Sequence, residues 1–362
     1  MDTEKKWGIF LAVFAMMFLL VGFARTGEAS SAGHGKKIVF VPMDNRPITD
    51  RQTREVVEKL GYEVVVPPDS LLGTRDQLGD PDGLWDWLRE NARGADAAVV
   101  SSDAMLYGSL VGSRNHEFDK ETVARRVERF REFHESYPRQ PVYVFGTILR
   151  TLLSQTHSGS GMEPEEYQRN ATKIRDYSVV RDKLDMGVLP EKKGKRDLEA
   201  LKSEINPSVL EAWESHHLLN QSANEALIDL TGQGIVSFFF LGADDSAPFS
   251  QTHYEGRHLQ AYGRDLGKTR FQLTSGADEL AMVMLCRAVN DNLGDIPFVY
   301  TAYNEGKGRE VIPTYCMEEI GKDVDGIIVA AGGMQVLSPQ RAEMVLRSIP
   351  TRMEKRGKQI PR

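Results

Sequence analysis

The sequence has little of the chemistry that marks several common protein classes. Its 362 residues include only two cysteines, Cys286 and Cys316, and contain no Cys-x-x-Cys or His-Glu-x-x-His spacing that would indicate a zinc site. Cys286 falls in a helical pattern, where we expect it to be a small core residue. A disulfide between the two cysteines requires an oxidising compartment, and the sequence leaves open whether it forms.

Nucleotide-binding signatures are also missing. The first predicted strand is not followed by Gly-x-Gly-x-x-Gly, and the chain has no phosphate-binding loop and no Gly-x-Ser-x-Gly motif. Its formal net charge is −7 and its isoelectric point about 5.7, so no basic surface is indicated. We therefore expect no cofactor, no bound metal and no nucleic-acid partner.

The N-terminus carries a long apolar run. Residues 7–24 follow a charged start and precede small residues at Ala29, Ser30 and Ala32. This pattern is typical of a signal peptide, and the run is also just long enough to act as a membrane anchor. Residues 1–35 are thus predicted to be a signal peptide or anchor plus linker. In both cases the body is extracytoplasmic, secreted or anchored, and meets the membrane only through this segment.

The rest of the chain has a globular composition, 41% hydrophobic and 27% charged, with strands and helices in alternation. The predicted strands are 37–42, 62–66, 95–101, 141–149, 235–242, 269–274, 296–301 and 325–330. This order predicts an α/β domain over 36–335 with a parallel sheet, either a (β/α)8-type barrel or, as the alternative, an open doubly wound sheet. Residues 163–231 are predicted to form a helical insertion, and the basic tail 336–362 is expected to be poorly ordered.

An acid pair follows the most apolar of these strands. The run 235–241 ends in Gly242 and Ala243, and Asp244 and Asp245 come next. Polar residues just after a buried parallel strand face the ligand crevice of α/β proteins. Two carboxylates this close disfavour joint ionisation, which suits acid/base chemistry. The alternative is structural, with Asp245 or Ser246 capping a following helix.

Other polar residues also follow predicted strands. They are Asp44, Asn45, Arg46, Asp103, Tyr107, Arg150, Asp278, Glu279, Asn304 and Glu305. Carboxylates, arginines and amides together can bind the hydroxyl groups of a polyhydroxylated ligand, so these residues are the candidate substrate-binding set. Structural alternatives remain for several of them: Asp44 can make a turn, Arg150 can be an ion-pair partner, and Asp278 and Glu279 can cap a helix.

Four motifs carry a resemblance to a known family. They are Phe-Val-Pro-Met-Asp-Asn-Arg-Pro at 40–47, the segment 100–110 with Ser113-Arg114, Leu-Gly-Ala-Asp-Asp at 241–245, and Gly-Ala-Asp-Glu-Leu at 276–280. Together they resemble the bacterial domain of unknown function 4127 family (DUF4127) from about residue 37 to 330. The resemblance implies no catalytic residues. It implies further C-terminal residues that this chain lacks, so we expect the chain to be C-terminally truncated relative to the family, with unrelated sequence from Ser338 onward.

The acid pair alone is similar to that of the substrate-assisted N-acetylhexosaminidases, where one acid orients the acetamido group and its neighbour is the general acid. On this basis the chain is predicted to be an exported carbohydrate-active, glycosidase-like hydrolase. Asp245 would be the general acid/base and Asp244 would orient the acetamide or stabilise the charged intermediate. The expected partner is a glycan or another polyhydroxylated small molecule.

Two other functions fit the same residues. One is an envelope protein that binds a glycan without cleaving it. The other is a metal-dependent hydrolase with Asp44, Asp103 and Asp244 as oxygen ligands.

Overall fold

The computed structural model describes residues 35–74, 76–152, 164–303 and 307–336. The predicted signal peptide or anchor and the predicted basic tail lie outside these ranges. Within them, no helix combines the length and the apolar character that crossing a membrane requires.

Six parallel strands form the central sheet, in the order β2-β1-β3-β4-β5-β6. Their bounds are β1 Lys37–Val41, β2 Glu63–Val65, β3 Ala97–Ser101, β4 Val142–Ile148, β5 Phe238–Ala243 and β6 Phe271–Ser275. All five neighbouring pairs are parallel, so every strand ends at the same edge of the sheet. The predicted α/β class with a parallel sheet is confirmed.

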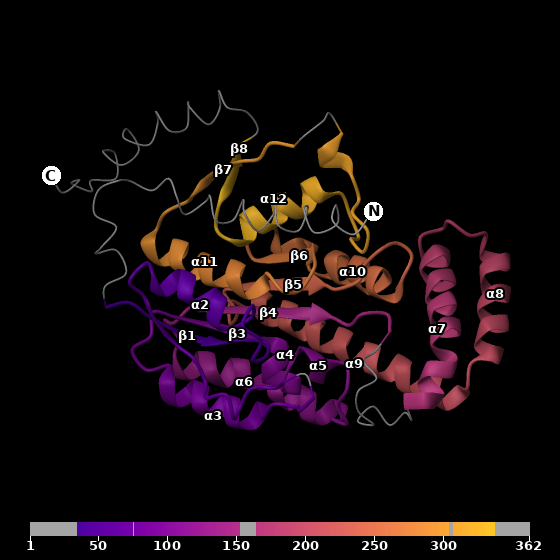
Figure 1. The fold of residues 1–362 in the computed structure, drawn as a ribbon, viewed down its shortest axis with the longest axis horizontal. Helices are drawn as coiled ribbons and strands as arrows, with labels where there is room; N and C mark the ends of the chain where they lie inside the picture. The colour runs from indigo at the N-terminus through magenta and orange to yellow at the C-terminus, as the bar shows by residue number, and fades with distance from the viewer. Residues whose placement is uncertain (1–34, 75, 153–163, 304–306, 337–362) are drawn as a thin grey trace, which may run out of the picture.

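Helices cover both faces of this sheet (Figure 1). Helices α2 (Arg51–Glu58), α11 (Leu280–Leu293) and α12 (Ile320–Ala330) lie on one side, and α3 (Pro81–Asn91), α6 (Lys120–Ser136) and α9 (Pro207–Gly232) lie on the other. The remaining helices are α4 Ser102–Tyr107, α5 Leu110–Ser113, α7 Pro164–Asp185, α8 Glu191–Glu204 and α10 Gln251–Tyr262, with short 3₁₀ turns at Arg264–Leu266 and Gly308–Glu310. Two helical layers around one parallel sheet are a feature of doubly wound α/β folds.

The final two strands do not extend the central sheet. Strands β7 (Phe298–Tyr300) and β8 (Met334–Val336) pair with each other in a separate two-stranded sheet. The segment predicted as the eighth strand, 325–330, is instead the second half of helix α12. In the described part of the chain, the eight strands that the predicted barrel requires therefore do not share one sheet. A short apolar run such as Ile327–Ala330 fits a buried helix as well as a strand, because periodicity cannot separate the two over so few residues.

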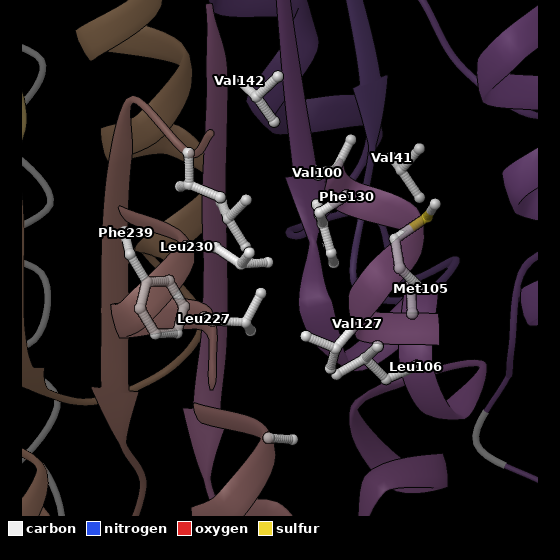
Figure 2. Packing of buried hydrophobic residues seen from close by; sticks show 14 of the residues in the cluster. Val41, Val100, Met105, Leu106, Val127, Phe130, Val142, Leu227, Leu230 and Phe239 are labelled. Carbon is white, nitrogen blue, oxygen red and sulfur yellow. The ribbon is translucent and has the colours of Figure 1, made fainter. Parts of the chain in front are cut away.

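Alternating side chains of the strands enter two cores. Odd-numbered residues of β1, such as Val39 and Val41, belong to the core that includes α3, α6 and α9, whereas Ile38 and Phe40 belong to the core that includes α2 and α11. Figure 2 shows the first core, in which Phe130 of α6 and Leu227 of α9 lie near the strands. Side chains that alternate between two buried faces explain why the strands read as unbroken apolar runs.

Three helices, α7 to α9, stand between β4 and β5, where the helical insertion was predicted. They have a small core of their own around Trp213, which is fully buried and donates its Nε1–H to the carbonyl of Thr151 at 2.8 Å. The bond ties the insertion to the end of β4. Both cysteines are free thiols in the structure, so the possible disulfide is not formed.

Candidate functional site

The turn after β1 holds Asp44 in a closed network. Thr49 Oγ1 donates to Asp44 Oδ1 at 2.6 Å, and Arg46 Nε lies 2.9 Å from Asp44 Oδ2. Arg46 also reaches Asp278, beyond β6, with 3.1 Å between Nη1 and Oδ1. Asp44 is 3% exposed and Asn45 is exposed. The structural alternative for Asp44, a turn, is therefore what the structure shows, while Arg46, Asn45 and Asp278 stay open to solvent.

Two predicted residues after β3 are buried. Asp103 and Tyr107 lie in the short helix α4 and are 1% and 2% exposed. Thr147 Oγ1 donates to Asp103 Oδ1 at 3.0 Å. Burial raises the pKa of Asp103 to about 7, although the Thr147 hydrogen bond and the charge of Arg114 act against it. Neither side chain can touch a ligand directly in this conformation.

The acid pair after β5 is held by two arginines. Arg114 Nη2 donates to Asp244 Oδ2 at 2.9 Å, and Arg150 Nη2 lies 3.4 Å from the same oxygen. Arg150 also forms an ion pair with Asp245. Asp244 and Asp245 side chains are 30% and 41% exposed, whereas Arg114 is almost fully buried at the C-terminal end of α5. The predicted partnership of Arg150 with these acids is present.

The helix-cap alternative for the acid pair is wrong. Helix α10 begins at Gln251, and its N-cap is Ser250, whose hydroxyl accepts from the backbone N–H of His253 at 3.1 Å. Asp245 instead lies in the left-handed region with φ of 53°. Consecutive side chains on an extended strand point opposite ways. The turn at Asp245 breaks that alternation, so both carboxylates reach Arg150.

Glu279 lies at the end of the turn after β6. It occupies the N-cap position of α11 but makes no side-chain cap bond there. Its carboxyl group folds back over Gly276, where a Cβ atom would come within 2.4 Å of Oε1, and Gly276 has φ of 101°. Glu279 is half-buried, and its pKa is raised to about 7, chiefly by burial and to a smaller extent by the charges of Asp278, Asp323 and Asp244.

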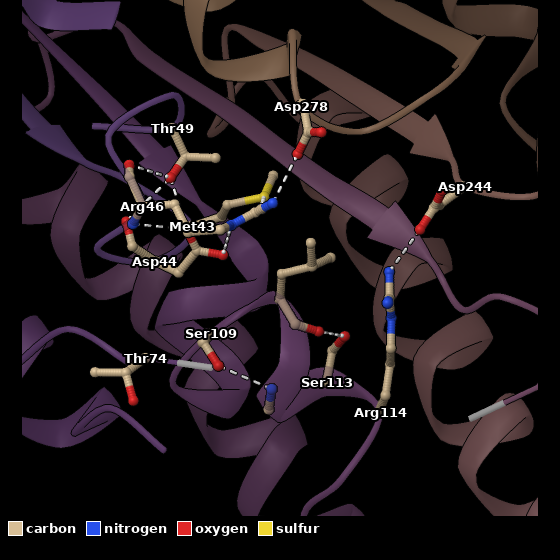
Figure 3. Close-up of polar contacts among 12 residues, drawn as sticks. Met43, Asp44, Arg46, Thr49, Thr74, Ser109, Ser113, Arg114, Asp244 and Asp278 are labelled. Atoms are coloured by element: carbon tan, nitrogen blue, oxygen red, sulfur yellow. Dashed lines mark hydrogen bonds and ion pairs between the residues drawn. The ribbon is translucent and has the colours of Figure 1, made fainter. Parts of the chain in front are cut away.

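Figure 3 shows Asp44, Arg46, Asp278, Arg114 and Asp244 at one edge of the sheet. The Arg46–Asp278 and Arg114–Asp244 ion pairs both lie at the carboxyl ends of the strands. Since the charges of both Asp278 and Asp244 act on Glu279, this glutamate belongs to the same polar edge as the two pairs. Asn304 and Glu305 lie outside the described residues.

Sequence reasoning missed Arg114 as a site residue. It does not directly follow a strand, because helices α4 and α5 separate it from β3. The available signal was its place in the Ser113-Arg114 motif.

The proposed metal ligands do not converge. Among the described residues, no group of three or more acidic, histidine or cysteine side chains is placed to hold a metal ion. Asp44 and Asp244 are paired with arginines, and Asp103 is bonded to Thr147. A cavity of about 380 Å³ lies elsewhere, lined by residues of α8 and α9 such as Lys202 and Leu218, and contains none of the predicted site residues.

A family model described as "Protein of unknown function (DUF4127)" matches residues 38–360. The chain belongs to this family. The DUF4127 match continues through the basic tail, so the expected truncation and the expected change to unrelated sequence at Ser338 are not supported. A search among curated proteins found no match.

Proposed function

We propose that this DUF4127 protein is an exported hydrolase of glycosidic bonds, with Glu279 as the general acid and Asp244 as the ionised carboxylate. The observation that carries the proposal is the contrast between these two acids. Asp244 forms ion pairs with Arg114 and Arg150. Glu279 has no arginine partner among the described residues, and its pKa is raised to about 7. Glycoside hydrolysis requires one protonated and one ionised carboxyl group.

This assignment moves the general-acid role from Asp245 to Glu279. Arg150 pairs with the carboxyl group of Asp245, whereas Glu279 has no arginine partner among the described residues. Asp245 is suited instead to accept a hydrogen bond from the substrate, for example from an acetamide N–H or a hydroxyl group. Its side chain is 41% exposed, so a ligand can reach it.

The remaining residues of the candidate site are of two kinds: some can contact the substrate, and others hold those residues in place. Arg46, Asp278 and Asn45 are open to solvent and can bind sugar hydroxyls. Asp44, Asp103 and Tyr107 are buried and would act on the substrate only through the residues they hold in place. The ligand class that fits this mixture of charges and amides is a glycan.

Export rests on the N-terminal sequence. The apolar run 7–24 and the small residues after it support a signal peptide or an anchor that places the domain outside the cytoplasm. Cell fractionation of the full chain, followed by N-terminal sequencing of the exported form, tests this point. Recovery of the whole protein in the cytoplasm would contradict it.

Hydrolysis is tested by incubating the full chain with N-acetylglucosamine oligomers and cell-wall glycans and measuring new reducing ends. Glu279→Gln should lower the rate by about 100-fold or more, since a positioned general acid contributes on that order. Asp244→Asn should have a similar effect. Glu191→Gln, in α8 and paired only with its helix neighbour Lys195 among the described residues, is the matched control and should retain full activity.

Three outcomes would count against the hydrolase. Wild-type protein that binds glycans and releases no reducing ends would support the glycan-binding alternative. Wild-type rates in Glu279→Gln would remove this residue from the chemistry. Absence of both binding and turnover across the glycan panel would refute the substrate class.

A further inference from the structure

A segment from outside the central sheet crosses the polar edge beside Asp245. It lies between the 3₁₀ turn Gly308–Glu310 and helix α12. The carbonyl of Tyr315 accepts from the backbone N–H of Ser246 at 2.9 Å, and the N–H of Met317 donates to Ser275 Oγ at 3.2 Å. Ser275 is the last residue of β6, and Ser246 directly follows the acid pair. The segment is thus fixed to the ends of both β5 and β6.

Two residues with an unusual backbone conformation lie at the hydrogen bond between Ser246 and Tyr315. Among the described residues, Asp245 and Tyr315 are the two non-glycine residues with positive φ, at 53° and 73°. The Ser246–Tyr315 hydrogen bond joins their two segments. A bulky residue in this region is strained, and such strain persists mainly where the surrounding structure fixes it, often at binding sites.

The side chain at this strained position is an exposed aromatic ring. Tyr315 is 64% exposed, and Val311 and Ile312 in the same segment are 53% and 52% exposed. Tyrosine offers a large, rigid apolar surface at low cost in conformational entropy, which makes it an effective contact residue. An apolar patch next to a charged edge has both components that a sugar requires: a pyranose ring has an apolar C–H face and a rim of hydroxyl groups.

We propose that Tyr315 is a stacking residue for a sugar ring that binds beside Asp245. In this arrangement the ring covers the tyrosine, and the hydroxyls of the neighbouring sugar reach the charged groups of the edge. The substrate is therefore an oligosaccharide of two or more units rather than a monosaccharide. This proposal rests on the glycosidase function given above and specifies the length and orientation of its substrate.

The test is calorimetric titration of the full chain with the N-acetylglucosamine tetramer and monomer, together with tetramer turnover. Tyr315→Ala should weaken tetramer binding at least fivefold and raise KM with little change in kcat. Tyr315→Phe keeps the ring and should stay within twofold of wild type. Tyr262→Ala is the matched control, because Tyr262 is 49% exposed near the far end of α10. Circular dichroism and Tm check that each variant folds.

The outcomes separate this proposal from the general one. If wild type binds or cleaves the tetramer and Tyr315→Ala does so equally well, the stacking role is refuted and the hydrolase stands. Equal loss in Tyr315→Phe and Tyr315→Ala would also refute stacking, since the ring is then not what matters. If wild type neither binds nor cleaves any glycan, both proposals fall.

Discussion

Carboxyl groups along the polar edge differ sharply in their surroundings. Asp44, Asp244 and Asp245 each contact an arginine, whereas Asp103 is buried and accepts a hydrogen bond from Thr147, and Glu279 has no arginine partner among the described residues. Three of the acids therefore face a positive charge, and burial raises the pKa of the other two to about 7. Position after a strand could be predicted for all five from the sequence. Their burial and their partners could not, because these depend on residues distant in the chain.

Asp103→Asn should change how stability depends on pH. The folded pKa of Asp103 is about 7, above the ordinary value of 3.8, so the folded protein binds a proton that the unfolded chain releases between these values. As the pH rises from roughly 4 to 7, the free energy of unfolding of the wild type should therefore fall, relative to the variant, by about 1.4 kcal/mol for each pH unit. Urea unfolding of both proteins across this range measures the difference. A difference that does not vary with pH would contradict the buried, proton-binding carboxyl group.

The partners of Arg114 could not be predicted from the sequence. It directly follows α5, yet its guanidinium group reaches Asp244 after β5, 130 positions along the chain. Its charge also acts on Asp103, so one buried arginine connects the ends of β3 and β5. A family motif marked the residue, but only the fold shows which acids it serves.

At the scale of elements, the strands of the central sheet were predictable because each is a short apolar run that ends in glycine or polar residues. Helix α12 was mispredicted as a strand for the same reason. Its run Ile327–Ala330 is as apolar as the strands, and only its packing against β6 and the small β7–β8 sheet makes it helical. The N-cap of the helix after β5 also differs from the structural alternative, which named Asp245 or Ser246. In the structure it is Ser250, before α10.

Strand β4 and helix α4 approach too closely for a side chain at Gly146. A Cβ atom there would lie 1.9 Å from Ser102 Oγ. Gly146→Ala should cost about 1–3 kcal/mol of unfolding free energy through overpacking. The hydroxyl group that clashes is absent in a Ser102→Ala background. Adding Gly146→Ala to that background should therefore cost at most half of what it costs in the wild type. Equal costs in both backgrounds, measured by urea unfolding, would show that this contact is not the cause.

The insertion is attached to α10 through a buried acid. Asp182 of α7 is fully buried, and its two oxygens lie 2.6 Å from His253 Nδ1 and from Arg257 Nη2. Asp182→Asn weakens both contacts, although Arg257 keeps its ion pair with Asp185, and should destabilise the protein by about 1–3 kcal/mol. Asp197→Asn, at an exposed pair with Arg196, should change stability by less than about 1 kcal/mol. Similar Tm values for the two variants would contradict the attachment.

For the whole molecule, alternating elements predicted a parallel sheet, but not its strand order or the separation of β7 and β8. Pairing between strands far apart in sequence sets both, and no local pattern encodes it. The parallel order has a functional consequence, because it brings the ends of β1, β3, β4, β5 and β6 to one edge. Acids and arginines from five separate segments are thereby gathered at the edge where Glu279 lies, and the charges of Asp278 and Asp244 act on it.

The most direct test of the account is the pH dependence of reducing-end release from the N-acetylglucosamine tetramer by wild type and Glu279→Gln. A general acid must be protonated to act, and the pKa of Glu279 is raised to about 7. We predict a wild-type rate that falls as pH rises through about 7, and a variant about 100-fold slower at lower pH and without that decline. A variant with the wild-type rate and pH profile would contradict the central claim.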